Sequence, residues 1–508
     1  MDDASATGTG TPDAIVVGSG PNGLAAAVTL ARAGLEVMVL ERASTIGGGA
    51  RSGALTIPGF THDLGSAVHP LALSSGFFRR FELAKRIRML VPEISYGHPL
   101  DGGAAGLAYR DLERTAEALG ADGPAWRQLF GPLVENAHHI AQLTGSPLLQ
   151  LPRHPLTTLR FGLRALEQGL PSWNLRFSEE VGPAMLSGLA AHSIQPMPSL
   201  STAGAALALG TTAHARGWPI PAGGSQAITD ALADDLRAHG GSIVTGAEVG
   251  DIRELPAARA VLFDTSPRAL SRIVGETLPK RYRERLEGYE YGNGVAKVDF
   301  ALSGPVPWTN EELRTTPTLH VGGSREEIAA GEEAVAAGGH PESPYVLVAQ
   351  PSVIDPSRAP EGQHTLWAYT HVPHGSTVDR EEAIIAQIER FAPGFRELIR
   401  ASSSRTAAQM QQQNANYLGG DIAVGEPTFA QLVARPVLST DPWRTPAKGV
   451  YLCSSATPPG PGVHGLAGYY AARSALKHEF GYKMHPYLGT GAPGAGAPSA
   501  AGLDGRSR

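Results

Sequence analysis

Apolar positions near the amino terminus change from a continuous run to a helical spacing and back. AIVVGSG begins with an apolar run, PNGLAAAVTLARAG carries apolar residues at helical spacing, and LEVMVLE is again mostly apolar. Short apolar runs bounded by glycine predict buried strands, whereas the periodic segment predicts a helix. Residues 13–41 are therefore predicted to form a strand, a helix and a strand, which is the repeating unit of a parallel sheet.

Two later segments show related patterns. Residues 218–264 contain a glycine turn, an amphipathic helix, Gly240-Gly241, a short strand ending near Val249 and a second strand. Farther on, VYLCSSA, TPPGPGVHG and LAGYYAARSALKHEF predict a buried strand, a rigid loop and a helix. Because a helix followed by a strand can extend a distant parallel sheet, we assign both segments to the sheet begun by residues 13–41. A separate helix-strand piece elsewhere stays the alternative for the middle segment.

The predicted fold class is α/β: a Rossmann-type dinucleotide-binding domain, discontinuous in sequence, with an α+β substrate domain. The first domain is assigned to 13–75, 215–280 and 445–485, and the second to 76–214 and 281–444. The 508 residues suffice for two or three packed domains. Residues 489–508, rich in Gly, Ala, Pro and Ser, are predicted to be a disordered tail.

The composition of the chain limits the kinds of molecule that it is expected to bind. A net charge of −6 with scattered Lys and Arg predicts no nucleic-acid partner, so a small-molecule substrate is expected. The single cysteine, Cys453, cannot form an internal disulfide, and the first residues do not resemble a signal peptide, which predicts a cytoplasmic protein. No stretch approaches the roughly 18 apolar residues of a membrane span. Peripheral membrane contact stays open.

Three glycines mark the phosphate site. Gly18, Gly20 and Gly23 form G-x-G-x-x-G between the first strand and helix, where they permit a tight turn, close approach of a pyrophosphate and close helix packing. Glu41 ends the second strand, where an acid accepts hydrogen bonds from ribose hydroxyls. An ordinary glycine turn in a βαβ unit is the alternative.

The next residues distinguish FAD from NADP. Arg42 beside Glu41 would suit the 2′-phosphate of NADP. However, Gly47-Gly48-Gly49 and Arg51 follow at once, a flexible turn and a cation that suit the second phosphate and ribityl chain of a longer cofactor. FAD is therefore favoured, and Gly48, Gly49 and Arg51 are predicted to contact it.

The same spacing recurs at Gly460, Gly462 and Gly465. Pro461 lies inside it and no second strand with an acid follows, so it does not predict a second Rossmann domain. The loop instead leads into a helix, whose amino end would stabilise negative charge on a reduced flavin. A structural loop that closes the sheet is the alternative.

These segments resemble the FAD-dependent carotenoid desaturase and retinol saturase superfamily, and most closely its branch called pyridine nucleotide-disulfide oxidoreductase domain-containing protein 2. Matching stretches include DAIVVGSGPNGLAAAVTLARAGLEVMVLERASTIGGGARS, GWPIPAGGSQAITDAL and YLCSSATPPGPGVHGLAGYYAA. The resemblance implies a glutathione-reductase-type FAD domain and a substrate domain over an apolar cavity. The positions that it assigns to FAD are Gly18, Gly20, Gly23, Glu41, Arg42, Gly48, Arg51, Val249, Gly462, Val463 and Gly465.

The chain departs from that family in one informative way. Carotenoid desaturases usually show a Gly-Ala pair after the last strand, where this chain has Ser454-Ser455-Ala456. The resemblance therefore does not extend to carotene as the substrate.

Histidines are the candidate acids and bases. His69 and His464 are the tentative catalytic candidates, with His192 and His320 behind them, and His464 is the best placed beside the flavin ring. A histidine in such a motif more often has a structural role than a catalytic one. His371 and His374 lack a supporting carboxylate or cysteine nearby in sequence, so no metal site is predicted. The small-residue run 200–213 predicts either the lining of a lipid tunnel or a buried helix.

The leading functional hypothesis is an FAD-dependent oxidoreductase that desaturates, saturates or oxidises a hydrophobic, isoprenoid- or lipid-like molecule. Three alternatives stay open: an amine oxidase, a flavoprotein with a regulatory or protein-interaction role, and a non-redox isomerase that uses reduced FAD.

Overall fold

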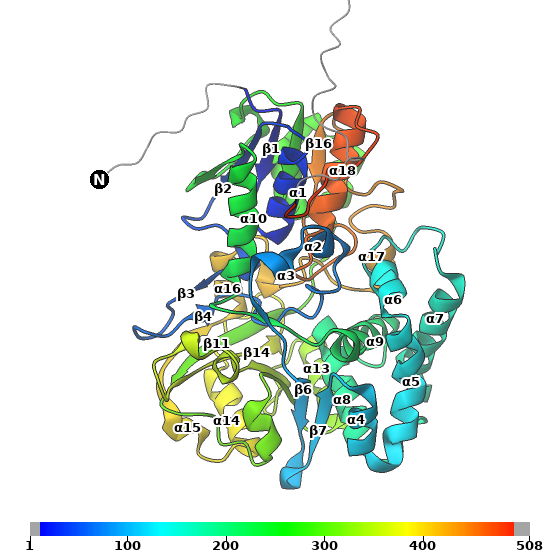
Figure 1. Ribbon diagram of the computed structural model, residues 1–508, viewed down its shortest axis with the longest axis vertical. Coiled ribbons are helices and arrows are strands. Elements are labelled where there is room, and N and C mark those ends of the chain that lie inside the picture. Colours follow the sequence, from blue (N-terminus) through cyan, green and yellow to red (C-terminus); the bar gives the residue numbers. More distant parts are fainter. Residues whose placement is uncertain (1–10, 492–508) are drawn as a thin grey trace, which may run out of the picture.

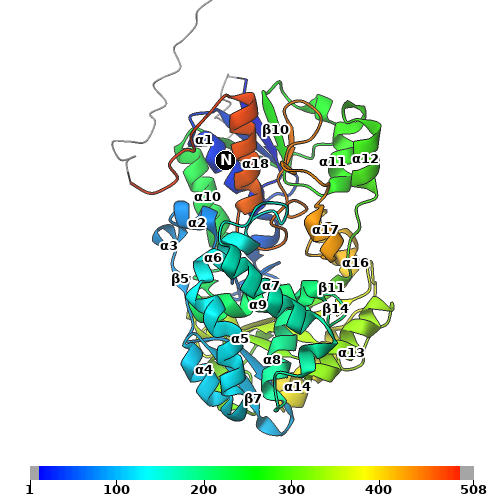
Figure 2. The same cartoon turned by 90° about the vertical axis from the view of Figure 1, so that its right-hand side faces the viewer.

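Two β-sheets, one above the other, organise the chain (Figures 1 and 2). The computed structural model describes residues 11–491. The upper part in both views contains a five-stranded sheet, and the lower part contains a seven-stranded sheet flanked by helices. This arrangement confirms the predicted α/β fold with a Rossmann-type domain.

The five-stranded sheet is parallel and has the order β16-β10-β1-β2-β9. The middle segment of the chain adds β10 beside β1 and β9 beside β2, so it belongs to this sheet and not to a separate unit. β9 ends four positions before Val249, which lies in the following loop. The strands are β1 (Ala14–Val17), β2 (Val37–Glu41), β9 (Ser242–Thr245), β10 (Ala260–Phe263) and β16 (Val450–Leu452).

Helices cover both faces of this sheet. Ala14 and Val16 of β1 pack toward one helical layer, and Ile15 and Val17 pack toward the other. Because both faces are covered, the strands are apolar at nearly every position. The first layer contains α1 (Pro21–Ala31), α10 (Gln226–Ala238) and α18 (Leu466–Glu479), and the second contains α11 (Pro267–Val274) and α12 (Lys280–Glu287).

The seven-stranded sheet is mixed, with the order β15-β11-β14-β13-β12-β6-β7. One face packs against α14 (Glu381–Phe391) and α15 (Phe395–Leu398), and the other faces the five-stranded part. The strands are β6 (Ile94–Pro99), β7 (Ala105–Tyr109), β11 (Gly294–Leu302), β12 (Thr318–Val321), β13 (Val346–Ala349), β14 (His364–Val372) and β15 (Ile399–Arg405).

A layer of helices flanks this sheet on the side that faces the viewer in Figure 2. α9 packs against α5, α7 and α8. The helices are α4 (Leu112–Ala118), α5 (Gly123–Glu135), α6 (Ala137–Thr144), α7 (Pro155–Gly169), α8 (Val181–Ala190) and α9 (Leu200–Ala215).

Packing continues past two of the predicted domain limits. Phe77 and Phe81, in and just after α2 (Gly76–Arg80), belong to the same apolar core as α1 and α18. Leu286 and Tyr289 likewise pack with β1 and β10. These residues lie beyond the predicted limits at 75 and 280, because short helices at each limit are held by the core of the five-stranded sheet.

The predicted tail, 489–508, lies outside the described residues except for its first three. There the carbonyl of Gly489 accepts a hydrogen bond from Arg32 and Thr490 donates two to Glu82, so the chain stays attached to the domain up to this point. Between residues 11 and 491, none of the helices has both the length and the apolar character needed to cross a membrane.

Candidate functional site

A cavity of about 1120 Å³ lies between the two sheets. Its upper wall is formed by the carboxyl ends of β1, β2 and β10 and by the loop after β16. Its lower wall is formed by β11, β13 and β14 and by α7 and α9. Ligands of open parallel sheets bind at the carboxyl ends of the strands, which is where this cavity begins.

The turn between β1 and α1 leaves room only for main chain. Gly18 has a φ of +102°, a conformation that residues with a Cβ rarely adopt. A Cβ on Gly23 would clash with the carbonyl oxygen of Gly18, and a Cβ on Gly20 would lie 2.5 Å from Asp264 Oδ2. Gly20 and Asn22 line the cavity, so the amino end of α1 faces it with its partial positive charge. This geometry suits a pyrophosphate.

Glu41 lies at the same edge of the sheet. Its Oε2 accepts hydrogen bonds from the backbone N–H and the hydroxyl of Ser19, at 2.9 and 2.6 Å, and its Oε1 accepts one from Ala43 N–H at 2.8 Å. An ionised carboxylate has about four acceptor positions. Glu41 therefore retains capacity for a ribose hydroxyl. Val249, mostly buried, lines the cavity nearby, and Arg42 is exposed at its rim.

The second glycine turn packs directly on the first. A Cβ on Gly48 would lie 2.9 Å from the Cα of Gly20, and a Cβ on Gly49 would clash with the hydroxyl of Tyr417. Arg51 donates to the carbonyls of Gly48 and Gln413, both at 3.0 Å, which fixes its guanidinium. All three predicted residues line the cavity. The residues present thus fit a dinucleotide longer than its first ribose and phosphate.

Asp264, at the end of β10, is a site residue that the sequence reasoning missed. Its Oδ2 accepts a hydrogen bond from Gly23 N–H at 2.9 Å. Burial raises the pKa of this carboxyl to about 7, the Gly23 N–H lowers it and the charge of Glu41 raises it. An acid after the apolar strand AVLF, at the edge that also carries Gly18 and Glu41, was the available signal.

The loop after β16 contributes part of what was predicted. Gly462 and Val463 line the cavity. Gly465 does not; it precedes α18 with a φ of +65°, and its Cβ would lie 2.5 Å from Phe77. His464 is buried, with Nε2 3.1 Å from the carbonyl of Gly460 and Nδ1 accepting from Leu466 N–H at 3.0 Å. Because both ring nitrogens hold its own loop, the geometry gives His464 a structural role, against its prediction as the best-placed acid or base.

His69 lines the cavity, and one of its ring nitrogens is buried without a hydrogen-bond partner among the described residues. Ser225 donates its hydroxyl hydrogen to the carbonyl of Ser66 at 2.7 Å, so His69 Nε2 must donate to Ser225 Oγ at 2.8 Å. Nδ1 is then unprotonated, and it has no hydrogen-bond partner among residues 11–491. Burial lowers the pKa of His69 to about 4, which keeps the ring neutral. His69 therefore has the geometry of a proton or hydrogen-bond acceptor.

The floor of the cavity is a polar and aromatic row that the sequence reasoning also missed. Lys297 of β11 pairs across the sheet with Tyr369 of β14, and Trp367 lies one row away opposite Asp299. Lys297 is fully buried, forms an ion pair with Asp299 and lies over the Trp367 ring at 5.6 Å. Burial lowers the pKa of Lys297. Two charges at alternate positions in the apolar strand GVAKVDFAL were the sequence signal.

The far end of the cavity is apolar. Leu200, Gly204, Ala208 and Leu209 of α9 line it, while Ala203 and Leu207 on the other side of the helix are buried in the core. Both interpretations of the 200–213 run are therefore partly correct, because one face of the same helix lines the cavity and the other packs.

The other histidines are mostly satisfied by protein. His192 lines the cavity, and its Nε2 lies 3.0 Å from Nε2 of the buried His320. His371 is hydrogen-bonded to Glu332, and His374 to the carbonyl of Gly292, so the two do not share a partner. Over the part of the chain that the structure describes, no three potential ligands group around a metal site.

Comparison with known proteins supports this picture of the site. The model of the NAD(P)-binding Rossmann-like domain matches residues 16–81. Pyridine nucleotide-disulfide oxidoreductase domain-containing protein 2 of Rattus norvegicus is 27% identical, over 92% of this chain and 93% of the relative. The neurosporene-forming phytoene desaturase of Rhodobacter capsulatus is 24% identical, over 90% and 92%.

Among solved structures, putrescine oxidase bound to putrescine superimposes with a TM-score of 0.57 at 19% identity, over 92% of this chain and 98% of that one. At this identity the likeness concerns the fold. Taken with the two sequence relatives and the Rossmann-like match, it supports the assignment of this chain to the superfamily of FAD-dependent oxidoreductases.

Proposed function

We propose that this protein binds FAD and transfers a hydride between the flavin and a hydrophobic, isoprenoid- or lipid-like molecule. The observation that carries the proposal is the continuity of the cavity. One space begins at the glycine turn and Glu41, passes Gly462 and Val463, and ends among the apolar side chains of α7 and α9. A cofactor and an apolar substrate held in this space would meet near its middle.

The cofactor-binding part comprises residues 13–75, 215–280 and 445–485 with the short helices that pack on them. The pyrophosphate would lie at the amino end of α1 and a ribose at Glu41. When bound, the flavin would supply the two-electron acceptor or donor. Gly48, Gly49, Arg51 and the Gly462-Val463 segment would hold the remainder.

The residues around the substrate orient it and exclude water. His69 has a buried Nδ1 lone pair without a partner among residues 11–491, and it would accept a proton or hydrogen bond that a bound substrate or cofactor brings to it. Lys297 is already neutralised by Asp299 and occupies one face of Trp367. The cavity therefore favours an uncharged substrate over a cationic one.

An amine oxidase is the second candidate, because Trp367 and Tyr369 form an aromatic pair in the cavity with ring centroids 5.1 Å apart. Their rings are inclined at 78°, and Lys297 already lies over the Trp367 ring, on a face that an ammonium group would need. Peroxide release with amines and no response to apolar compounds would favour this candidate.

The first test is the visible spectrum of the purified protein, before and after anaerobic NADPH. A flavin spectrum is expected. Bleaching by NADPH would favour saturation or another reductive reaction, whereas persistence would favour desaturation or oxidation of the organic substrate. A protein that neither carries nor takes up flavin would contradict the proposal.

The second test blocks the apolar end of the cavity. Gly204 lines it, and an added Cβ there meets no atom within 4 Å. Gly204→Leu should fill this space while favouring the helix, and Gly204→Ala is the matched control. We expect Gly204→Leu to keep its flavin but to lose at least about tenfold in flavin reduction or oxidation by isoprenoid alcohols and hydrocarbons. An unchanged rate would place the substrate elsewhere.

A further inference from the structure

The leucines of α7 point away from the protein core. They recur every three or four residues, at 156, 159, 163, 166 and 170, and so form one stripe along the helix and its end. All five are exposed, and Leu156 is 74% exposed, while Thr157 and Gln168 on the other side are buried. An amphipathic helix in a globular protein normally packs its apolar residues inward. In α7, Phe161 and Ala165 do so, and the leucines form a further apolar stripe that stays exposed.

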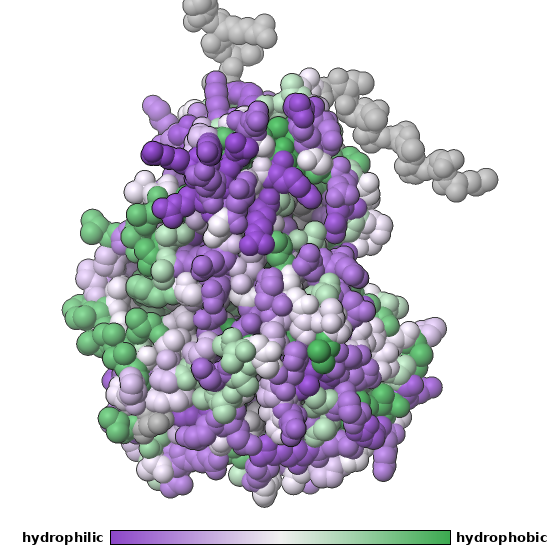
Figure 3. Space-filling view, turned by 180° about the vertical axis from the view of Figure 1, so that it is seen from behind, coloured by the Kyte–Doolittle hydropathy of each residue, from purple (hydrophilic) through white to green (hydrophobic). Residues whose placement is uncertain are grey.

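The segment before α7 extends the stripe. Leu148 and Leu149 are exposed, and Leu151 is 92% exposed. The view from behind shows hydrophobic residues gathered along the edge of the molecule where α7 lies (Figure 3). We call the exposed leucines of residues 148–170 the leucine surface. A contiguous apolar patch of this kind marks an interaction site.

A cationic groove of about 2300 Å³ lies beside the leucine surface. Nine Lys and Arg side chains line it, against one carboxylate, Asp441. None of the nine forms an ion pair within residues 11–491. They come from α2, α12, α18 and the loops around them, and include Arg79, Arg285, Arg473, Lys477 and Lys483.

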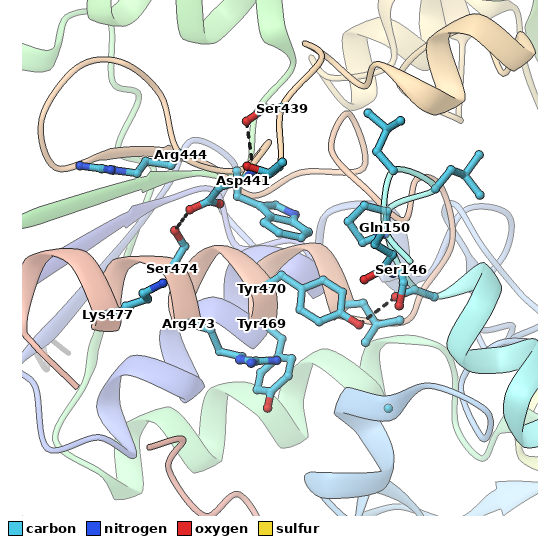
Figure 4. Close-up of a pocket in the computed structure, with 18 of the residues that line it drawn as sticks. Ser146, Gln150, Ser439, Asp441, Arg444, Tyr469, Tyr470, Arg473, Ser474 and Lys477 are labelled. Atoms are coloured by element: carbon cyan, nitrogen blue, oxygen red, sulfur yellow. Dashed lines mark hydrogen bonds between the residues drawn. The ribbon is translucent and has the colours of Figure 1, made fainter. Parts of the chain in front are cut away.

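Figure 4 shows one wall of this groove. Arg473 and Lys477 project from α18, and Arg444 lies beyond them. Ser474 donates to Asp441 at 2.5 Å, which holds the single carboxylate against α18. Ser146 and Gln150, from the segment that leads to the leucine surface, lie across the groove. The cations thus line the same groove as Ser146 and Gln150, which belong to the segment that leads to the exposed leucines.

The groove and the cavity share a wall. Leu143, Ser146, Leu148 and Thr158 line both. Leu159, Leu163 and Leu166 also line the cavity and are exposed, so the cavity reaches the surface at α7. A ligand that covers the leucine surface would thus lie at the entrance to the apolar end of the cavity.

We propose that the leucine surface and the cationic groove dock this protein on an anionic phospholipid bilayer. The leucines would enter the acyl boundary and the cations would bind head-group phosphates, as in interfacial amphipathic helices beside basic residues. The charge imbalance selects an anionic surface, and the exposed leucines need a partner that takes apolar side chains. The proposal rests on the proposed function only in that an apolar substrate would enter from the bilayer.

The test is co-sedimentation of the flavin-loaded protein with vesicles of phosphatidylcholine alone or mixed with phosphatidylglycerol. Binding should be at least about tenfold stronger on the mixed vesicles and should weaken as salt is raised. Failure of the protein to bind mixed vesicles would overturn the proposal.

Three sets of variants separate the contribution of the leucines from that of the cations. Leu151→Asp with Leu156→Asp, neither of which lines the cavity, should lower binding at least about tenfold. Val244→Asp with Val378→Asp, at exposed apolar positions elsewhere, should not change it. Replacing Arg153, Lys477 and Lys483 by Gln should remove the preference for anionic vesicles. Equal binding by the leucine variant and its control would contradict the proposal.

Two further readouts keep the outcomes distinct. Light scattering without vesicles detects dimers; a dimer that the leucine variant abolishes, with no vesicle binding, would assign the surface to a second copy and overturn the proposal. Bound flavin is measured in the same samples. Flavin without vesicle binding would reject only the docking surface, and vesicle binding without flavin would reject only the proposed function.

Discussion

Two glycine turns with the same spacing, Gly18-x-Gly20-x-x-Gly23 and Gly460-x-Gly462-x-x-Gly465, differ in what each glycine contacts. In the first turn the third glycine is limited by main chain, since a Cβ on Gly23 would clash with the carbonyl of Gly18, directly after β1. In the second, Gly465 adopts a φ of +65° and is limited by the side chain of Phe77. The close main-chain approach of α18 is made instead by Gly468, whose Cβ would clash with the carbonyl of Asn22.

The difference shows why spacing alone does not define a site. The first turn holds a helix end against the sheet and faces the cavity, whereas the second holds α18 against α1 and contributes Pro461, Gly462 and Val463 to the cavity wall. The role of each turn depends on what can approach its glycines closely. An anion can approach the first turn, and a neighbouring helix packs at the second.

The largest expected effect is at the first turn. Gly23→Ala forces its Cβ into the Gly18 carbonyl, which cannot move without displacing β1. We expect loss of bound flavin and a fall of about 3 kcal/mol in the free energy of unfolding. Flavin absorbance and chemical denaturation measure both. Gly204→Ala, where a Cβ has open space, is the control, and full flavin retention by Gly23→Ala would break the comparison.

The next largest effect is expected from replacing His69 in the cavity, compared with replacing His464 in the second glycine turn. His69→Gln keeps hydrogen bonding but removes a proton acceptor, so flavin reduction in stopped-flow should slow by roughly 100-fold. His464→Gln should leave the rate within about threefold and lower the free energy of unfolding by about 1–2 kcal/mol, because it loses bonds to Gly460 and Leu466. The opposite pattern would restore His464 as the acid or base.

The raised pKa of Asp264 predicts that FAD binding at the first turn depends on pH. Its folded pKa, about 7, lies above the ordinary value of 3.8, so the favourable contribution of the protonated form is complete below about pH 4 and is lost as pH rises through 7. A pyrophosphate at Gly20 would be repelled by the ionised form. Titration of flavin-depleted protein should show FAD binding weakening roughly tenfold from pH 6 to 8.5. Asp264→Asn should flatten this profile; a slope unchanged by it would contradict the assignment.

The smallest effect is expected for Arg42→Gln. Arg42 is exposed at the cavity rim, and an exposed ionic contact is worth less than about 1 kcal/mol. FAD affinity measured by fluorescence should therefore change by less than about threefold. A loss of NADPH binding of tenfold or more in this variant would instead indicate a 2′-phosphate at Glu41 and Arg42.

Local chemistry made the first turn predictable. One βαβ unit contains all four predicted residues, Gly18, Gly20, Gly23 and Glu41. Their spacing along the sequence is therefore enough to predict their positions at the site. The parallel sheet was also predictable from local patterns. Apolar strands that alternate with helices form a parallel sheet in most proteins, because few other arrangements bury both kinds of element.

Convergence of distant segments was not predictable in this way. Asp264 joins the first turn across more than 200 positions, and Lys297 with Trp367 becomes a cavity floor only through the register of β11 and β14. The structural role of His464 could not be predicted, for a related reason. The sequence of the loop indicates that the ring lies near the site, but it does not reveal that both ring nitrogens are hydrogen-bonded within the loop.

The strand order β16-β10-β1-β2-β9 also constrains how the protein is made. On the ribosome, β1 and β2 emerge together, but β10 begins at residue 260 and β16 at residue 450. At roughly 5–20 residues per second, β1 waits more than ten seconds for the neighbour that completes its hydrogen bonding. Its unpaired edge must be protected during that time, and the cofactor-binding sheet is complete only after β16 has emerged, more than 400 residues after β1.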